Sequence, residues 1–271
     1  MQHTPRKRFS QNFLVDRHYI GRIVDAINPQ PGDTLVEIGP GRGAMTRALL
    51  ERTQHLTAIE IDRDLAGQLQ TEFDASRLTV IVADALTVDL GAIATDGRRL
   101  RVAGNLPYHI SSPLLFHCAQ YAESLVDCTF MLQAEVVDRM AAAPSTPEYG
   151  RLSVSLQSLF EVTRLFGVPP GAFFPVPAVD SAIVRLVPLD AARRPPIVDR
   201  AAFDACVTAA FGQRRKTLRN ALRPLANAAL LESVGVDPGV RGETLAVDDY
   251  VRIANAISAQ PAQSAPSSLE R

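Results

Sequence analysis

The feature that most constrains the fold is the regular alternation of short apolar runs with helix-like segments between residues 17 and 140. The predicted strands are residues 34–38, 55–61, 78–83, 99–103 and 128–132, and the predicted helices are residues 17–27, 44–52, 63–73, 114–121 and 133–140. Strands and helices that alternate at this spacing form βα units, whose strands lie parallel in one sheet. The sequence therefore predicts an α/β fold with a Rossmann-like, doubly wound sheet.

The C-terminal third has a different pattern. Residues 181–188 read as a last strand that closes the sheet domain, and residues 190–196 have the composition of a linker. Residues 199–258 are predicted to be helical throughout, with breaks near Gly212, Pro224 and Pro238. Residues 260–271 are rich in proline, serine, alanine and glutamine. The predicted parts are an arm over residues 1–15, the sheet domain over 16–189, a small all-helical domain over 190–258 and a disordered tail over 259–271.

Composition excludes some classes of protein. No apolar run in the 271 residues is long enough to cross a bilayer, and the first ten residues do not resemble a secretory signal. The cysteines Cys118, Cys128 and Cys206 lack the Cys-x-x-Cys spacing of a metal site or redox motif. We expect a cytoplasmic protein with reduced thiols, no metal and no membrane association.

Glycines and acids mark the ends of three predicted strands. Gly39, Gly41 and Gly43 follow the first strand, where the absence of Cβ atoms lets a ligand approach the backbone. Glu60 ends the second strand, about twenty residues beyond the glycines, where a carboxylate can bind both ribose hydroxyls. Asp84 ends the third strand and could accept the amine of an adenine. These residues predict a pocket for an adenosine, although a dinucleotide-binding dehydrogenase would fit the glycine spacing equally well.

The turn after the fourth strand separates these alternatives. Residues 105–108 read Asn-Leu-Pro-Tyr, and Ser112 followed by Pro113 predicts a helix N-cap and first helical position just beyond them. Such a turn holds an amide oxygen, a backbone carbonyl and an aromatic ring close together, a combination that suits a flat base with an exocyclic amine. The simpler interpretation is a proline-stiffened turn with a half-buried tyrosine. A methyltransferase acting on a base needs such a turn, whereas a dehydrogenase does not.

Positive charge is concentrated near the C-terminal helices, although the net charge of the chain is only −1. Residues 193–225 contain eight arginines and lysines against two aspartates. The run Arg214, Arg215, Lys216 and Arg219 predicts a surface that binds nucleic-acid phosphates. The alternative is an ordinary solvated face of a basic helix.

Six segments in order resemble the ribosomal RNA adenine dimethyltransferase family, and within it the bacterial small-subunit enzymes. They are Arg-Lys-Arg-Phe-Ser-Gln-Asn-Phe-Leu (6–14), Val-Glu-Ile-Gly-Pro-Gly (36–41), Asn-Leu-Pro-Tyr (105–108), Tyr-Gly-Arg-Leu-Ser-Val (149–154), Phe-Phe-Pro-Val-Pro-Ala-Val-Asp-Ser (173–181) and Phe-Gly-Gln-Arg-Arg-Lys-Thr-Leu-Arg-Asn (211–220). The resemblance covers about residues 6–255.

The resemblance implies a class I methyltransferase that uses S-adenosylmethionine to dimethylate N6 of two adjacent adenosines in a hairpin loop near the 3′ end of small-subunit (16S) rRNA. It implies seven cofactor contacts, namely Asn12, Leu14, Gly39, Gly41, Glu60, Asp84 and Asn105. It also implies that Asn105, Leu106, Pro107 and Tyr108 hold the target base and that Phe173 covers the other face of that base.

Two related functions stay open at this point. One is an enzyme that methylates large-subunit rRNA, against which the segments at residues 149–154 and 211–220 argue. The other is a non-catalytic, RNA-binding assembly factor, against which the intact turn at residues 105–108 argues. The expected partner is small-subunit rRNA, free or within an immature subunit, and the expected oligomeric state is a monomer, with a further role in subunit biogenesis.

Overall fold

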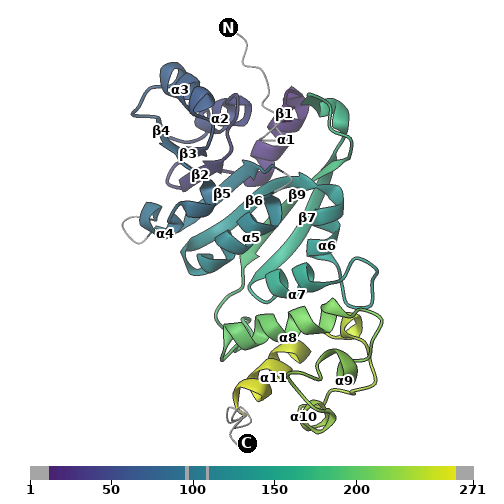
Figure 1. Ribbon diagram of the computed structural model, residues 1–271. Helices are drawn as coiled ribbons and strands as arrows, with labels where there is room; N and C mark the ends of the chain where they lie inside the picture. The colour runs from purple at the N-terminus through teal and green to yellow at the C-terminus, as the bar shows by residue number, and fades with distance from the viewer. Residues whose placement is uncertain (1–11, 95–97, 108–109, 261–271) are drawn as a thin grey trace, which may run out of the picture. The chain divides into compact units, whose positions relative to one another are not determined.

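The computed structural model describes residues 12–94, 98–107 and 110–260 (Figure 1). The chain divides into two compact units, one formed by residues up to 141 together with 159–189, and the other by residues 142–158 together with those from 190 onward. The sequence predicted a single boundary near residue 190, whereas the structure groups residues 142–158 with the C-terminal helices.

A seven-stranded sheet forms the centre of the first unit, in the order β4-β3-β2-β5-β6-β9-β7 (Figure 1). Its strands are β2 (Thr34–Ile38), β3 (Leu56–Glu60), β4 (Leu78–Val82), β5 (Leu100–Asn105), β6 (Leu125–Gln133), β7 (Phe160–Val168) and β9 (Ser181–Pro188). Neighbours from β4 to β6 pair in parallel, while β9 pairs antiparallel with both β6 and β7. The doubly wound sheet is confirmed, with one antiparallel edge that the sequence analysis did not predict.

The strand order reverses between β2 and β5. From β2 the chain runs outward to β3 and β4, and it then returns to place β5 on the other side of β2. Open α/β sheets bind ligands at such a switch point, outside the carboxyl ends of the strands. The loops after β2, β3, β4 and β5 all lie at that edge, so they are where a site is expected.

Helices connect the strands of the first unit. They are α1 (Arg17–Ile27), α2 (Ala44–Leu50), α3 (Arg63–Glu72), α4 (Leu90–Ile93), α5 (Ser111–Gln120) and α6 (Ala134–Ala141). Local chemistry explains the bounds of α1, because the Asp16 carboxylate accepts from the N–H groups of His18 and Tyr19. The helix ends at Asn28, whose φ of 48° is left-handed.

A small two-stranded ladder joins distant parts of the first unit. Strand β1 (Phe13–Leu14) pairs antiparallel with β8 (Phe173–Phe174), so that Leu14 lies opposite Phe173. The Val15 N–H continues the pairing with the Ala172 carbonyl at 2.9 Å. Leu14 and Phe173 belong to the buried cluster that also contains residues of α1, α2 and the central strands. The end of the predicted arm is therefore built into the core.

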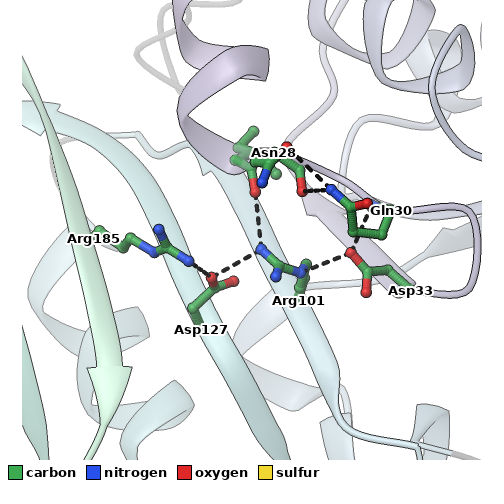
Figure 2. Close-up of polar contacts among 7 residues, drawn as sticks. Asn28, Gln30, Asp33, Arg101, Asp127 and Arg185 are labelled. Atoms are coloured by element: carbon green, nitrogen blue, oxygen red, sulfur yellow. Dashed lines mark hydrogen bonds and ion pairs between the residues drawn. The ribbon is translucent and has the colours of Figure 1, made fainter.

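A buried ion network ties the starts of β5 and β6 to β9 (Figure 2). The Arg101 side chain bridges Asp33, at 2.7 Å, and Asp127, at 3.0 Å, and donates to the Ile27 carbonyl at 2.9 Å. Arg185 on β9 contacts the same oxygen of Asp127. Because Asp127 is only 2% exposed, its charge depends on these two guanidinium groups.

The second unit is helical in its described part. It contains α7 (Arg151–Gln157), α8 (Arg200–Gly212), α9 (Leu218–Ala221), α10 (Ala228–Ser233) and α11 (Val247–Ser258). Its own core includes Tyr149, Phe203 and Tyr250. The buried Tyr149 and Tyr250 hydroxyls donate to the carbonyls of Leu245 and Gly242, so neither polar tip costs stability. The unit is helical as expected, and it also includes residues 142–158, which the sequence assigned to the sheet domain.

None of the described helices combines the length and the hydrophobicity of a membrane-spanning segment. The three cysteines are buried and unbridged, as the sequence indicated.

Candidate functional site

One pocket lies at the switch point, where the loops after β2, β3, β4 and β5 meet β1. The empty space at the site is about 1080 Å³, a figure that includes open solvent. All seven of the predicted cofactor contacts line it, namely Asn12, Leu14, Gly39, Gly41, Glu60, Asp84 and Asn105. Leu106 and Pro107 of the predicted base-binding turn line it as well. Residues that lie up to 95 positions apart in the sequence, from Asn12 to Pro107, therefore share one cavity.

The loop after β2 requires glycine at its turning points. Gly39, Gly41 and Gly43 have φ values of 68°, 58° and 74°, in the left-handed region. A Cβ atom on Gly43 would lie 2.8 Å from the Leu69 side chain, and one on Gly41 would lie 3.1 Å from the Phe13 ring. The loop is consequently held between α3 and β1 with its backbone facing the pocket.

Two buried carboxylates stand behind this loop. Glu60 accepts from the backbone N–H groups of Gly41, at 3.1 Å, and Asp62, at 2.9 Å. Glu37 is 1% exposed and accepts from the Thr46 hydroxyl at 2.6 Å. Burial raises the pKa of Glu37 to about 7, with repulsion from Glu60 adding to it and the Thr46 hydrogen bond opposing it. Burial likewise raises the pKa of Glu60, against the hydrogen bonds from the backbone.

Asp84 closes the pocket beyond Glu60. Its Oδ1 accepts from the Leu86 N–H at 3.0 Å and so begins the short turn Ala85–Thr87. This capping contact fixes the carboxylate at the end of β4. Across the strand order, Asp84, Glu60 and the glycine loop thus mark successive positions along one edge of the sheet.

The end of β5 approaches β2 so closely that Gly104 is required. A Cβ atom there would lie 2.4 Å from the Ile38 carbonyl oxygen. The next residue, Asn105, donates from Nδ2 to the Asn12 carbonyl at 3.1 Å. With its nitrogen anchored in this way, the amide presents Oδ1 as its remaining polar atom.

The two carbonyls that follow Asn105 differ in their partners. The Pro107 carbonyl accepts from the Ser111 hydroxyl and from the Ile110 N–H, both at 3.1 Å. The Leu106 N–H donates to the Met131 carbonyl at 3.1 Å, which fixes the peptide between Asn105 and Leu106 that precedes the Leu106 carbonyl. Of the two carbonyls that the sequence offered as base acceptors, Pro107 is therefore already used within the turn.

The start of the following helix differs from the prediction. Helix α5 begins at Ser111 with Ile110 as its N-cap, so Ser112 is not the cap and Pro113 is the third helical residue. Ser111 turns back to the Pro107 carbonyl and takes over the stabilisation of the turn. Tyr108, the predicted stacking residue, lies outside the described residues.

Phe173 is not on the pocket wall. Its side chain is 3% exposed and packs in the core, and β8 pairs it with Leu14. A ring in this position has no face free for a base, so the prediction that Phe173 covers the base is not met in this arrangement. The side chain of Phe174, the next residue, lies on the opposite face of the strand and is 57% exposed.

The basic residues of the second unit divide into two kinds. Arg214 pairs with Glu243 at 2.9 Å and donates to the Pro147 and Tyr149 carbonyls, so it holds the loop before α7. Arg215, Lys216 and Arg219 are exposed. Arg223, which the sequence analysis did not include among the candidates, is exposed as well.

Phe13 and Arg42 are among the lining residues that the sequence-based site prediction did not name. The Arg42 guanidinium lies over the Phe13 ring, 4.6 Å from its centroid. Neither residue ends a predicted strand, and their proximity depends on the pairing of β1 with β8. The apolar Phe13 between two candidate residues, Asn12 and Leu14, was the one available signal.

Comparison with known proteins gives a consistent result. A family model described as ribosomal RNA adenine dimethylase matches residues 2–259. A relative from Aromatoleum aromaticum, named ribosomal RNA small subunit methyltransferase A, is 56% identical over 259 residues, which are 96% of each chain. A relative of the same name from Chromobacterium violaceum is 52% identical over 94% of this chain and 96% of its own.

Two solved structures share the fold. A 23S rRNA methyltransferase, ErmE, matches with a TM-score of 0.67 and 28% identity over 91% of this chain and all of its own. A dimethyladenosine transferase from Plasmodium falciparum matches with a TM-score of 0.76 and 23% identity over 89% of this chain and 95% of its own. At that identity the second match supports the fold alone.

Proposed function

Because the chain belongs to the ribosomal RNA adenine dimethylase family, we propose how its residues carry out the S-adenosylmethionine-dependent dimethylation of rRNA adenines. The observation that carries the proposal is the single pocket that joins the glycine loop, the strand-end acids and the Asn105 turn. The proposed target is a pair of adjacent adenosines in a hairpin loop near the 3′ end of small-subunit rRNA.

The donor set of the pocket fits this cofactor. Glu60 would bind the ribose hydroxyls, Asp84 would accept from the adenine amine, and the backbone at Gly39 and Gly41 would lie against the ligand. Asn12, Leu14 and Asn105 would surround its amino-acid end. When bound, S-adenosylmethionine supplies a methyl group on a positively charged sulfur, which is already a good leaving group.

Asn105 and Leu106 would orient the target nitrogen. The lone pair of adenine N6 is delocalised into the ring, so the nucleophile is weak until the amine is held in a more pyramidal form. Asn105 Oδ1 and the Leu106 carbonyl would each accept a hydrogen bond from the N6 amine. We assign the second hydrogen bond to the Leu106 carbonyl because the Pro107 carbonyl already accepts from Ser111 and Ile110. The turn thus contributes positioning and electrostatics, and its neutral amide is consistent with proton loss after transfer.

The second methylation places a further demand on the same turn. A monomethylated N6 has one proton left, so it can use only one of the two acceptors. We propose that the space beside Leu106 accommodates the first methyl group. Tyr108 remains the proposed stacking partner of the base, in a loop substrate whose bases can be unstacked at low cost.

The second unit would bind RNA phosphates through Arg215, Lys216 and Arg219. The proposed substrate is the rRNA, free or in an immature small subunit, and the proposed setting is the cytoplasm, with the enzyme as a monomer and no metal. Large-subunit rRNA is the second candidate, supported by the 28% identity to a 23S rRNA methyltransferase. The identity to small-subunit relatives is about twice as high, which favours small-subunit rRNA.

The decisive experiment is methyl transfer to unmethylated ribosomal subunits. Small and large subunits are incubated separately with the protein and labelled S-adenosylmethionine, and the product nucleosides are mapped by mass. We expect dimethyladenosine at two adjacent positions of small-subunit rRNA. Label in the large subunit alone, or monomethyladenosine as the final product, would contradict the proposal.

A variant tests the role of the turn. Asn105→Ala removes one of the two proposed acceptors, so transfer should fall at least about 100-fold, as for other lost electrostatic donors or acceptors. Retention of the RNA on a filter should be unchanged. Gln70→Ala, which truncates an exposed amide on α3, is the matched control. Normal turnover by the Asn105 variant would exclude this amide as an acceptor.

A further inference from the structure

Arg42 contributes a positive charge to a pocket whose other charged lining residues, among those described, are carboxylates. The described lining includes three carboxylates, Glu37, Glu60 and Asp84, and Arg42 is the one cationic side chain among these described lining residues. A pocket with this balance favours cations. Any anionic group of a ligand would be repelled unless it lay beside Arg42.

The position of Arg42 is fixed by its surroundings. Its guanidinium lies over the Phe13 ring, at 4.6 Å from the centroid, and its carbonyl accepts from Arg47 at 3.0 Å. Arg47 is itself held by two contacts to Glu72 on α3, at 2.5 and 2.6 Å. Stacking uses the flat face of a guanidinium, while its N–H groups point outward in the plane, which is the geometry of carboxylate binding.

The strand order indicates which part of the cofactor reaches Arg42. Asp84 lies just beyond β4 and would take the adenine, and Glu60 ends β3 and would take the ribose. The next strand, β2, carries the loop that contains Arg42, and β5 beyond it carries Asn105. The part of the ligand beyond the ribose therefore lies beside Arg42. In S-adenosylmethionine this part is the amino-acid end, which bears the only negative charge of the molecule.

We infer that Arg42 binds the α-carboxylate of S-adenosylmethionine and of the product S-adenosylhomocysteine. This inference rests on the proposed function. The guanidinium stacks on the Phe13 ring, so Phe13 of β1 and Arg42 of the glycine loop together form the proposed carboxylate subsite. The carboxylates would interact with the cationic and hydroxyl groups of the ligand, and Arg42 would provide the positive charge that pairs with its carboxylate.

The test compares two ligands that differ only in the carboxylate. The affinities of S-adenosylmethionine and decarboxylated S-adenosylmethionine are measured by titration calorimetry on the full-length wild type and on Arg42→Met. We expect the variant to bind S-adenosylmethionine about tenfold more weakly and the decarboxylated compound nearly as well as the wild type. The ratio of the two affinities isolates the pairwise contact, because other effects of the substitution cancel.

Two further variants sharpen the comparison. Arg42→Lys keeps the charge without the planar fork and should recover part of the ratio. Arg52→Met removes an exposed arginine that pairs with Asp25, and it should change neither affinity. The thermal midpoint of each variant, measured without ligand, reports whether the fold is intact.

The outcomes separate the two proposals. If Arg42→Met weakened both ligands by the same factor, Arg42 would act only by supporting Phe13, and the carboxylate assignment would be wrong. A wild type that bound neither compound would instead overturn the cofactor site as a whole. Wild-type binding with an unchanged ratio in the variant would refute this inference and leave the proposed function standing.

Discussion

At the scale of single residues, Glu37 has the clearest consequence for pH dependence. It lies behind the glycine loop, 1% exposed, with the Thr46 hydroxyl as its partner and Glu60 nearby. Burial raises its pKa from 4.5 to about 7. A raised pKa in the folded state means that the folded protein holds this proton more tightly than the unfolded chain.

The sign of the effect on stability follows directly. The contribution of Glu37 to stability is fully present below about pH 4.5 and is lost as the pH rises through about 7. Glu37→Gln has no charge to bury and can still accept from Thr46. Relative to the wild type, the variant should gain up to about 3 kcal/mol between pH 4 and pH 8. Urea unfolding at several pH values checks this, and a constant difference across the range would contradict it.

The candidate site could be predicted in part because strand ends mark it. Glu60 and Asn105 end β3 and β5, and Asp84 follows β4 by two residues. The apolar runs of these strands are visible in the sequence, and parallel strands end at one edge. Phe13 and Arg42 could not be found in this way, because their contact forms only when β1 pairs with β8. Which of Phe173 and Phe174 is buried depends on that same pairing, since a shift of one residue exchanges the two faces of a strand.

At the scale of secondary-structure elements, β8 makes a prediction that separates its two rings. Phe173→Ala opens a cavity in the core beside Leu14 and should cost about 3–5 kcal/mol of stability. Phe174→Ala removes an exposed ring and should cost less than about 0.5 kcal/mol. Chemical denaturation measures both. A larger loss for Phe174→Ala than for Phe173→Ala would mean that β8 presents its opposite face to the core.

The ion network at the start of β5 and β6 makes a second prediction at this scale (Figure 2). Asp127→Ala leaves Arg101 and Arg185 without their shared partner, and it should cost about 3–5 kcal/mol. Asp25→Ala breaks a pair with Arg52 in which Asp25 is 65% exposed, and it should cost less than about 1 kcal/mol. Denaturation midpoints compare the two, and equal costs would show that the network is not structurally important.

Elements with strong periodic patterns were predicted almost to the residue. Helix α1 and strands β2 and β9 have the predicted bounds. Strand β7 was not predicted, because it lies at the edge of the sheet, where most of its positions are exposed or half-buried, and so it has no continuous apolar run. The two-residue strands β1 and β8 are too short to have a pattern, and only tertiary pairing defines them.

At the scale of the whole molecule, the net charge of −1 does not show that the basic residues of the second unit have different roles. Arg215 and Lys216 are exposed, whereas Arg214 pairs with Glu243. Arg215→Ala and Lys216→Ala should each weaken RNA binding and lower the salt dependence of the binding constant by about one unit of slope. Filter binding at several salt concentrations measures this. An unchanged slope would exclude these residues from phosphate contact.

Arg214 belongs to a different class. Arg214→Ala removes its pair with Glu243 and its contacts to the Pro147 and Tyr149 carbonyls, so the main effect should be a lower thermal midpoint. The sequence could not separate Arg214 from its neighbours, because charge alone does not reveal which arginine has an internal partner. A normal midpoint together with a reduced salt slope would return Arg214 to the RNA-binding set.

The pairing of β1 with β8 also bears on how the protein is made. Its two strands lie about 160 positions apart in the chain, at residues 13–14 and 173–174. A growing polypeptide leaves the ribosome from its N-terminus, so the segment of Asn12 to Leu14 emerges early but finds its partner strand only after residue 174 has followed. The part of the pocket wall that β1 forms is therefore completed late in synthesis, after the glycine loop, Glu60, Asp84 and Asn105 have all emerged.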